Sequence, residues 1–320
     1  MRIDNPPNAR AVATSRRRFI ATTLALASAA GMPRPMIAAD ANQTDGWIDA
    51  HTHVWTSDTA SYPLAAGYRR DEMRPASFTL DEFFQHARPA GVTRAVLIQM
   101  SFYGFDQRYL LDELAASEGS CAGVAVIDDD GQDPAAEMRR LQTSGVRGFR
   151  IYPRNRPVAN WLDGPGMAAM WRCAADADLA ICPLINPDAL PALDAMCERH
   201  PGTTVVVDHF ARIGVDGNFR DRDIDQLCRL ARHQRTHVKV SAYYALGRKQ
   251  PPYDDLAPLI RRVFDAYGPK RLMWASDCPF QIVGQSYNDS IGLIRDRLDF
   301  LAAADKEWLL RKTAERVFFT

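Results

Sequence analysis

The sequence predicts an α/β protein of the (β/α)8 type, the TIM barrel, and three observations predict it. Eight short apolar runs recur between residues 47 and 280. Segments with apolar residues three and four positions apart separate them, which is the period of an amphipathic helix. No Pro/Gly-rich linker or fixed-period repeat divides the 320 residues. Eight such strand and helix units close naturally into one barrel. An open doubly wound sheet is the alternative.

The apolar runs are the expected strands, and they are nearly continuous rather than alternating with polar residues. This pattern is typical of parallel strands covered on both faces. In chain order the runs are 47–55, 93–100, 121–128, 146–152, 179–186, 203–211, 237–244 and 271–280. The clearest helical spacing lies in residues 106–117, 133–142, 223–234 and 254–268.

The longest connection, residues 56–78, follows the first strand. In a barrel this loop lies over the end where catalysis occurs. We therefore expect either a lid over the site or a flexible insertion.

The first 39 residues predict a twin-arginine export signal. The segment SRRRFIATTLALASAAG begins at Ser15 with arginines followed by a weakly apolar stretch. Pro33 and Pro35 end that stretch too early for a membrane span. We expect residues 1–39 to be a signal, residues 40–320 to form one barrel domain, and the protein to be periplasmic or otherwise exported. A basic helix belonging to the mature fold is the alternative.

Charge and cysteine usage narrow the class of partner. Without residues 1–39 the chain has 33 Lys and Arg against 38 Asp and Glu, an acidic balance that argues against nucleic acid as the partner. A small molecule is the expected ligand, and assembly into a homo-oligomer stays open. The irregular spacing of the cysteines inside apolar segments favours buried free thiols over disulfides. They stand at positions 121, 173, 182, 197, 228 and 278.

Four polar residues stand at the carboxyl ends of three predicted strands, where barrel enzymes carry their chemistry. His51 and His53 in IDAHTHVW share one strand parity, so both can face inward. His209 ends the sixth strand and Asp277 the eighth. A lone strand-end histidine is more often a packing residue, and Asp277 alone could cap a helix. Barrel closure places the first and eighth strands together, which favours one catalytic site.

The chemistry of this set suits hydrolysis. A carboxylate such as Asp277 can take a proton from water and return it to the departing oxygen. His51, His53, Asp277 and His209 are suitable ligands for a single Zn²⁺ with one position left for water. The histidines at positions 86, 200, 233 and 237 are expected to be surface or structural residues.

Arginines near the fourth strand predict recognition of a carboxylate or sulfonate. Arg147 and Arg150 have opposite strand parity, so at most one faces the pocket, and Arg150 is our choice. A solvated loop with ion pairs is the alternative for this basic cluster. Further candidates for substrate contact are Tyr152, Arg154, Ser101, Tyr103 and Arg212, and on the seventh strand Lys239, Ser241 and Tyr243 share parity, with Tyr243 nearest the catalytic end.

The motifs HTH, VVVDHFAR, WASDCPF and KTAERVFF resemble the amidohydrolase superfamily, in its amidohydrolase-2 branch of lactone hydrolases. The resemblance covers residues 46–320. IQMSFYGFDQRYLLDEL and GVRGFRIY are similar to the group of 2-pyrone-4,6-dicarboxylate hydrolases and related enzymes. The resemblance implies opening of a lactone that bears acidic groups, such as a pyrone dicarboxylate, a muconolactone or a sugar-acid lactone. It leaves open whether a zinc ion assists or the histidines polarise the carbonyl without metal.

The sequence departs from that superfamily at three places. The fourth strand has Gly148 and Arg150 where many metal-dependent members have a lysine, and the fifth strand, ending in CPLIN, has no histidine. A binuclear metal site is therefore not expected. Ala211 and Arg212 follow the strand-six histidine where relatives often have glycine. Alternatives are a metal-dependent decarboxylase of aromatic acids, a lactone isomerase, or a binding protein without activity. No G-x-S-x-G motif for a serine hydrolase is present.

Overall fold

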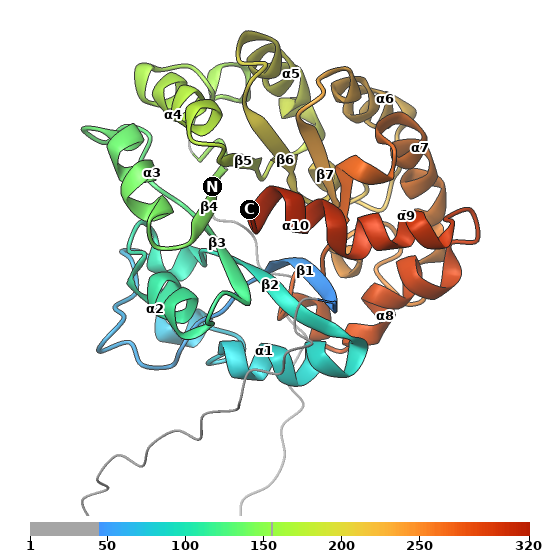
Figure 1. Ribbon diagram of the computed structural model, residues 1–320, viewed down its shortest axis with the longest axis horizontal. Coiled ribbons are helices and arrows are strands. Elements are labelled where there is room, and N and C mark those ends of the chain that lie inside the picture. The colour runs from blue at the N-terminus through green and yellow to red at the C-terminus, as the bar shows by residue number, and fades with distance from the viewer. Residues whose placement is uncertain (1–44, 155) are drawn as a thin grey trace, which may run out of the picture. The chain divides into compact units, whose positions relative to one another are not determined.

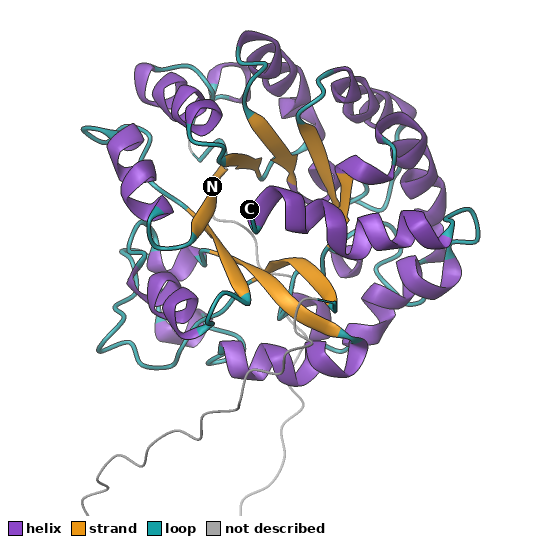
Figure 2. Ribbon diagram, in the orientation of Figure 1, coloured by secondary structure: helices purple, strands orange, loops and turns teal. Residues whose placement is uncertain are grey.

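The computed structural model describes residues 45–154 and 156–320. Within them, eight parallel strands follow one another around a barrel in chain order, with helices on the outside (Figures 1 and 2). The TIM-barrel prediction is confirmed. A doubly wound sheet is wrong for this chain because its strand order would reverse at a switch point. The predicted signal, residues 1–39, lies outside the described residues.

All eight predicted strands form, and each begins within one residue of its predicted start. They are β1 Trp47–Thr52, β2 Val92–Ile98, β3 Cys121–Ala125, β4 Val146–Ile151, β5 Ala180–Pro183, β6 Thr204–Val207, β7 Thr236–Val240 and β8 Leu272–Trp274. Each strand ends earlier than its apolar run. The residues that follow turn out of the hydrogen-bonded ladder, and several of them carry the polar side chains predicted to form the site.

The helices cover the outside of the barrel by their apolar faces. In α7, the buried residues Leu259, Ile260 and Val263 recur at spacings of one and three, which places them on one helical face. The helices are α1 Leu80–Ala87, α2 Arg108–Ala116, α3 Pro134–Gln142, α4 Pro165–Asp176, α5 Leu190–Arg199, α6 Asp221–Arg229, α7 Ala257–Tyr267, α8 Tyr287–Gly292, α9 Ala303–Glu307 and α10 Thr313–Phe318.

Two apolar layers fill the structure. The larger lies between the strands and the helices, and the smaller fills the barrel interior with residues such as Ile48, Val96 and Met273. Phe318 of α10 belongs to the interior layer. Helix α10 therefore closes the end of the barrel at which the strands begin (Figure 1). The opposite end, where the strands finish, is left for the site.

The barrel closes between β1 and the residues after β8. Thr52 and Cys278 form a parallel bridge. The Asp277 N–H donates to the His51 carbonyl at 2.9 Å, and the His53 N–H donates to the Cys278 carbonyl at 2.8 Å. The contact predicted between the first and last strands is therefore confirmed, and it joins the histidine pair directly to Asp277.

A β-bulge in β1 decides which way the histidines face. Asp49 pairs with Ala95 and Thr52 with Leu97. Between these two pairs the chain advances three residues in β1 but only two in β2. Ala50 belongs to the interior layer, and regular alternation would turn His51 away from that interior. The extra residue changes the phase of the strand. As a consequence, two consecutive residues, Ala50 and His51, both face the interior of the barrel.

The six cysteines, all in the described residues, are free thiols, as predicted, and five of them are buried. In the described part of the chain, no helix has both the length and the apolar character to cross a membrane.

Candidate active site

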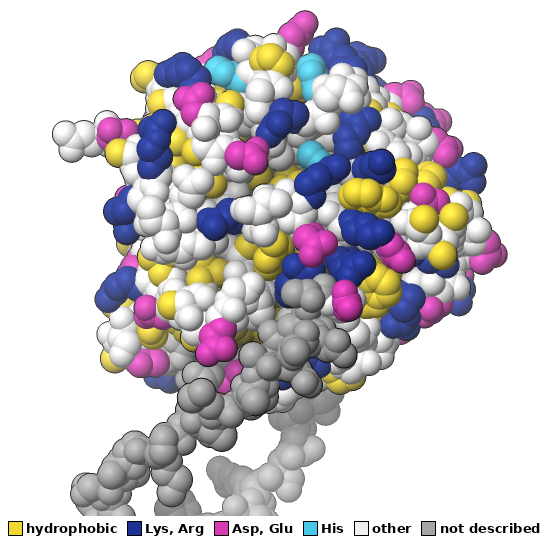
Figure 3. Space-filling model, viewed as in Figure 1, with side chains coloured by type: hydrophobic (Ala, Val, Ile, Leu, Met, Phe, Trp, Pro, Cys, Tyr) yellow, Lys and Arg dark blue, Asp and Glu magenta, His cyan; other side chains and the backbone are white. Residues whose placement is uncertain are grey.

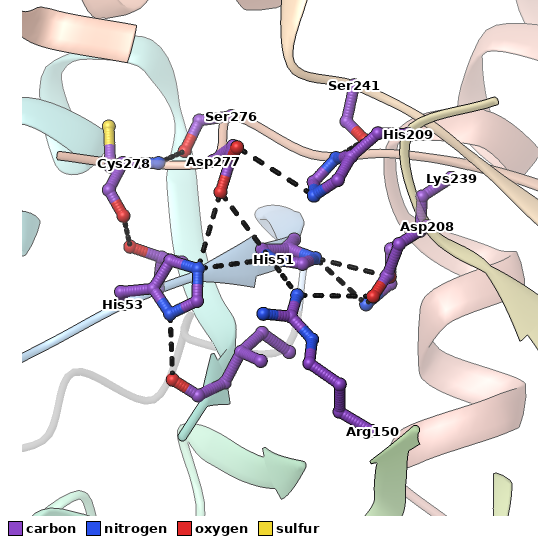
Figure 4. A network of polar contacts seen from close by, with 12 residues as sticks. His51, His53, Arg150, Asp208, His209, Lys239, Ser241, Ser276, Asp277 and Cys278 are labelled. Atoms are coloured by element: carbon purple, nitrogen blue, oxygen red, sulfur yellow. Dashed lines mark hydrogen bonds and ion pairs between the residues drawn. The ribbon is translucent and has the colours of Figure 1, made fainter. Parts of the chain in front are cut away.

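Three acceptor atoms converge where β1 and β8 end. The Nε2 atoms of His51 and His53 lie 3.3 Å apart. Asp277 Oδ1 lies 3.5 Å from the His51 Nε2 and 3.4 Å from the His53 Nε2. Figure 4 shows these side chains pointing toward one another from neighbouring elements of the barrel. All three are buried. The sequence predicted this group, and the barrel brings it together.

The outer ring nitrogens determine the tautomers. His53 Nδ1 lies 3.0 Å from the Ile98 carbonyl oxygen, an acceptor, so Nδ1 carries the proton. His51 Nε2 lies 2.7 Å from the Arg150 Nη2 donor, so Nε2 is an acceptor and the proton is on Nδ1, which lies 3.4 Å from Asp208 Oδ1 and 3.2 Å from Lys239 Nζ. Burial, together with the nearby Lys239 cation, lowers the pKa of His51 well below its usual value, so the ring is neutral. Both Nε2 atoms therefore face Asp277 Oδ1, a buried oxygen that receives no hydrogen bond from the residues that the structure describes.

Three such acceptors repel one another unless a cation or a donor lies between them. The ligand atoms of tetrahedral Zn²⁺ are about 3.3–3.4 Å apart, since each lies about 2.0–2.1 Å from the ion. The observed separations of 3.3, 3.5 and 3.4 Å match that edge. Imidazole held by a carboxylate or carbonyl on its outer nitrogen is also the usual zinc-ligand arrangement. The donor set therefore fits one zinc ion.

Arg150 competes for part of this centre. Its Nη2 lies 2.7 Å from the His51 Nε2 and donates to Asp208 Oδ2 at 3.1 Å. A single lone pair on the His51 Nε2 cannot serve both the guanidinium and a metal ion. Loading of a metal onto His51 therefore requires Arg150 to move away from that nitrogen.

Asp277 stays ionised in this setting. Burial alone would raise its pKa, but the surrounding His209, His53 and His51 rings hold the pKa of Asp277 far below its usual value. Its Oδ2 accepts a hydrogen bond from the Tyr244 hydroxyl at 2.7 Å. The backbone of Asp277 is left-handed, with φ of 63°, which turns the carboxylate toward the histidines. Asp277 is thus an anchored carboxylate with one free oxygen.

His209 joins the site beside the triangle of acceptors. Its Nδ1 lies 2.8 Å from Ser241 Oγ, and its Nε2 lies 3.7 Å from Asp277 Oδ2. Burial lowers the pKa of His209 to about 4, so the ring is neutral at pH 7. His209 thus lies beside Asp277 but outside the group with metal-ligand spacing that His51, His53 and Asp277 form.

The backbone around His209 is unusual. Residues 209–211 have φ between 52° and 53°, and Arg212 has φ of 59°. A run of left-handed non-glycine residues is costly, about 1–2 kcal/mol each, and such strain concentrates at functional sites. The predicted strand 203–211 therefore stops at Val207 and gives way to the turn Asp208–Arg212.

A buried ion-pair group lies next to His51, and its central residue, Asp208, was not among the predicted site residues. Asp208 lies 3.1 Å from both Lys239 Nζ and Arg150 Nη2. Burial would raise the pKa of Asp208, but Lys239 and Arg150 hold it well below its usual value. Lys239 Nζ also lies 3.2 Å from His51 Nδ1. A charged residue next to His209 inside an apolar strand is the signal that could have revealed Asp208.

The seventh strand supplies residues by the expected parity, with one correction. Lys239 and Ser241 reach the site, whereas Tyr243 turns away and donates to the Val240 carbonyl at 3.0 Å. The next residue, Tyr244, contacts Asp277. Ala242 has a left-handed φ of 59°, which breaks the strand alternation between Ser241 and Tyr243.

The two arginines of β4 separate as their parity predicts. Arg150 faces inward and joins the site. Arg147 lies near the start of β4 and donates to the Gln142 and Val146 carbonyls at 2.9 and 3.1 Å. The placement of Arg147 in the substrate site is therefore corrected, because its guanidinium caps the end of α3 instead.

Arg154 and Tyr152 lie beside Arg150 along a small hollow of about 220 Å³. Arg154 is already neutralised by Asp129 at 2.7 Å and Asp128 at 3.1 Å. Tyr152 is half-buried in the wall of the hollow. The predicted basic cluster is thus largely an ion-paired loop, and Arg150 is the member of that cluster that contacts His51.

The other predicted contacts lie at the rim. Tyr103 is buried, and its hydroxyl accepts the Thr56 N–H at 3.1 Å, so it anchors the loop after β1. Ser101 is half-buried in the turn that follows β2. Arg212 is half-buried near Tyr244. Burial raises the pKa of the Tyr244 hydroxyl well above its usual value, and the Arg212 charge opposes part of that rise. Neither Ser101 nor Arg212 joins the triangle of acceptors.

The long loop after β1 is anchored at both ends. Trp55 and Phe78 exchange backbone hydrogen bonds of 2.9 and 2.8 Å, which close the loop at its base. The Ala65 N–H donates to the Phe102 carbonyl at 2.8 Å. Trp55 contacts Phe280, which in turn packs against the His53 ring with centroids 5.7 Å apart. The loop is thus a packed wall beside the site.

Known proteins resemble this chain in sequence. The amidohydrolase profile Amidohydro_2 matches residues 48–320. L-fucono-1,5-lactonase from Burkholderia ambifaria is 28% identical over 76% of this chain and 83% of its own. A 4-sulfomuconolactone hydrolase from Rhizobium radiobacter is 26% identical over 73% and 76%. The 2-pyrone-4,6-dicarboxylate hydrolase of Comamonas testosteroni is 28% identical over 80% and 84%.

Solved structures show the same fold. An amidohydrolase from Burkholderia multivorans with bound zinc superposes with a TM-score of 0.72 at 24% identity, covering 85% of this chain and 98% of that one. The 5-carboxyvanillate decarboxylase of Sphingomonas paucimobilis has a TM-score of 0.60 at 15% identity, over 85% and 98%. At these identities the likeness establishes the fold alone.

Proposed function

The chain belongs to the amidohydrolase family, and from that premise we propose that it hydrolyses a cyclic ester, a lactone, by attack of water. The observation that carries the proposal is the buried Asp277 Oδ1, which faces the Nε2 atoms of His51 and His53 and, in the described part of the chain, receives no hydrogen bond. A free carboxylate oxygen in a buried, preorganised setting is suited to accept a proton from a water molecule. The relatives named above, each a lactone hydrolase by name, support this reaction class.

Asp277 begins the reaction as a general base. It takes one proton from water, and the resulting hydroxide attacks the lactone carbonyl carbon. The new C–O bond forms as the carbonyl π electrons move onto oxygen. That electron pair then returns, the ring C–O bond breaks, and Asp277 returns its proton to the departing oxygen. The product is one open-chain hydroxy acid per water consumed.

His51, His53 and Asp277 would hold a divalent metal ion, with zinc as the best fit. When bound, such an ion lowers the pKa of water and polarises the carbonyl. The Ile98 carbonyl accepts a hydrogen bond from His53 Nδ1, and Asp208 Oδ1 lies 3.4 Å from His51 Nδ1, so both Nε2 atoms face the centre once Arg150 leaves His51. Neutral His209, fixed by Ser241 and adjacent to Asp277, is placed to contact the reacting oxygens.

Arg150 is our proposed contact for an acidic group of the substrate. It is the inward-facing cation of β4, only 8% exposed, and it lies beside the hollow lined by Tyr152 and Arg154. A guanidinium binds a carboxylate or sulfonate by paired hydrogen bonds. A substrate carboxylate that draws Arg150 away from His51 would also free the Nε2 lone pair.

The test is turnover of a panel of sugar-acid, muconolactone-type and pyrone dicarboxylate lactones, followed by acid release. Asp277→Asn should lower kcat by at least about 100-fold, since general base catalysis contributes 10²–10⁴-fold. The exposed Asp216→Asn is the matched control and should retain activity. Unchanged hydrolysis by Asp277→Asn would refute its role as base. Carbon dioxide release from aromatic acids, without lactone opening, would favour the decarboxylase alternative.

We propose further that residues 1–39 direct export through the twin-arginine pathway. Arg16→Lys together with Arg17→Lys removes the arginine pair while preserving charge. Fractionation of bacterial cells that express the two forms should find the unaltered chain outside the cytoplasm and the double variant inside. Equal distribution of both forms would contradict the proposal.

A further inference from the structure

A second group of charged side chains lies at the end of the barrel opposite the acceptors described above. An open hollow of about 1230 Å³, mouth included, is lined by residues where β5 to β8 begin and by α10. Five basic side chains line it: Arg235, His237, Lys270, Arg271 and Arg316. Figure 3 shows this face of the barrel, on which many Lys and Arg side chains are exposed with Asp and Glu side chains among them. The hollow is larger than the one beside Arg150.

Positive charge in this hollow is largely uncompensated. Asp178, its one acidic lining residue, pairs with Arg235 at 2.7 Å. Within residues 45–154 and 156–320, no ion pair joins Lys270, Arg271 or Arg316 to a carboxylate. Three cations thus line one concave surface, and none of them has a described carboxylate within ion-pair distance. Like charges at such close quarters raise the local potential and attract anions.

Neutral groups hold these cations in place. Arg271 donates from Nε to the Tyr267 carbonyl at 3.0 Å and from Nη1 to the Ala231 carbonyl at 2.8 Å. Arg316 donates from Nη2 to the Lys270 carbonyl. The Arg271 guanidinium also lies 5.1 Å from the centre of the Tyr267 ring. Carbonyl groups and an aromatic ring orient a guanidinium without cancelling its charge. Ordering before binding reduces the entropy that an incoming ligand must offset.

Lys270 and Arg316 also share one aromatic partner. Their cationic groups lie 5.3 and 5.5 Å from the centre of the Trp308 ring. Both cations therefore lie near the same indole ring, which attracts each of them by a cation–π interaction. A ligand with several oxygen acceptors can contact both at once.

His237 is a buried lining residue of the hollow. Burial, followed by the Arg316 and Arg271 charges, lowers the pKa of its imidazole to about 4. The ring is buried, and its Nδ1 lies 3.1 Å from the Arg235 carbonyl. A neutral ring therefore forms the inner wall, and the cations surround it.

We propose that this hollow binds a compact oxyanion with two or more negative charges, such as inorganic phosphate or a small dicarboxylate. Guanidinium groups pair with such oxygens in a forked geometry, and Lys270 adds a point charge. The site is separate from Asp277, His51, His53 and His209, and the proposal does not depend on lactone hydrolysis.

The test measures thermal unfolding of the full-length chain in phosphate, in malonate and in sodium chloride of equal ionic strength. At about 30 times its Kd, the anion should raise the folded-to-unfolded ratio about 30-fold. For a chain of this size, that is a rise in Tm of roughly 5 °C. The dependence of Tm on anion concentration gives the Kd. A larger shift in phosphate or in malonate tells the two anion types apart.

Arg316→Gln should weaken phosphate binding about tenfold or more, since a charge-assisted hydrogen bond is lost. Lys270→Gln removes a charge without removing a backbone hydrogen bond. This second variant therefore tests the site even if Arg316→Gln fails to fold. Arg222→Gln, an exposed arginine on α6, is the matched control and should keep the full shift. Lactone turnover by Lys270→Gln should equal that of the unaltered chain.

Three outcomes would overturn the proposal. One is a shift no larger than sodium chloride produces. Another is a phosphate shift that survives in both Lys270→Gln and Arg316→Gln. The third is loss of the shift in Arg150→Ala alone, which would place the anion at the catalytic end of the barrel.

Discussion

Asp208→Asn is the sharpest test of how the site is held. The substitution keeps the shape of the side chain but removes a charge that lies 3.1 Å from both Lys239 and Arg150. Asp208 and Lys239 are fully buried. At an effective dielectric constant near 20, each pair at this distance is worth about 5 kcal/mol before desolvation is counted. Removal of one partner of a buried pair typically costs about 3–5 kcal/mol.

We therefore expect Asp208→Asn to lower the free energy of unfolding by about 3–5 kcal/mol in urea denaturation at pH 7. Because Asp208 also orients His51 Nδ1, zinc affinity should fall about 10–100-fold. Adding Lys239→Met, which removes the stranded cation, should restore part of the lost stability.

Asp216→Asn is the control for Asp208→Asn. Its carboxylate pairs with Arg220 on the exposed surface at 2.5 Å, and such pairs contribute about 0–1 kcal/mol. If Asp208→Asn unfolds at the same urea concentration as this control and binds zinc equally well, the buried ion pairs do not support the site as argued.

Three further predictions use other parts of the chain. Arg150→Ala should raise KM for acidic lactones at least about ten times more than KM for neutral lactones, whereas Arg147→Ala, at the far end of β4, should alter neither; equal effects on both substrate classes would remove Arg150 from acid recognition. Burial lowers the pKa of His237 from 6.5 to about 4, so the stability that its neutral form contributes is present above about pH 6.5 and is lost as the pH falls toward 4. His237→Asn should therefore reduce the stability lost between pH 7.5 and pH 4.5 by up to about 3 kcal/mol in urea unfolding; an unchanged pH dependence would show that other groups set it. Glu118 is exposed with a left-handed φ of 51°, so Glu118→Gly should raise Tm by about 1–4 °C in calorimetry, while Glu118→Ala, which keeps the Cβ, should not; equal Tm values for the two variants would exclude backbone strain as the cause.

The fold and the central trio of side chains follow from the sequence alone. Continuous apolar runs separated by helical spacing specify parallel strands with covered faces, and eight of them close into a barrel. Closure by itself brings the end of the first strand to the end of the eighth. His51, His53 and Asp277 are therefore neighbours as a consequence of chain order.

Which way those side chains face, and what supports them, was decided only by the tertiary structure. The bulge in β1 turns His51 inward, and left-handed residues after β6 and β8 redirect His209 and Asp277. Such changes of phase leave no mark in the hydrophobic period of a strand. The group formed by Asp208, Lys239 and Arg150 joins β4, β7 and the turn after β6, and its energy depends on distances of about 3 Å in a buried setting that no local pattern encodes.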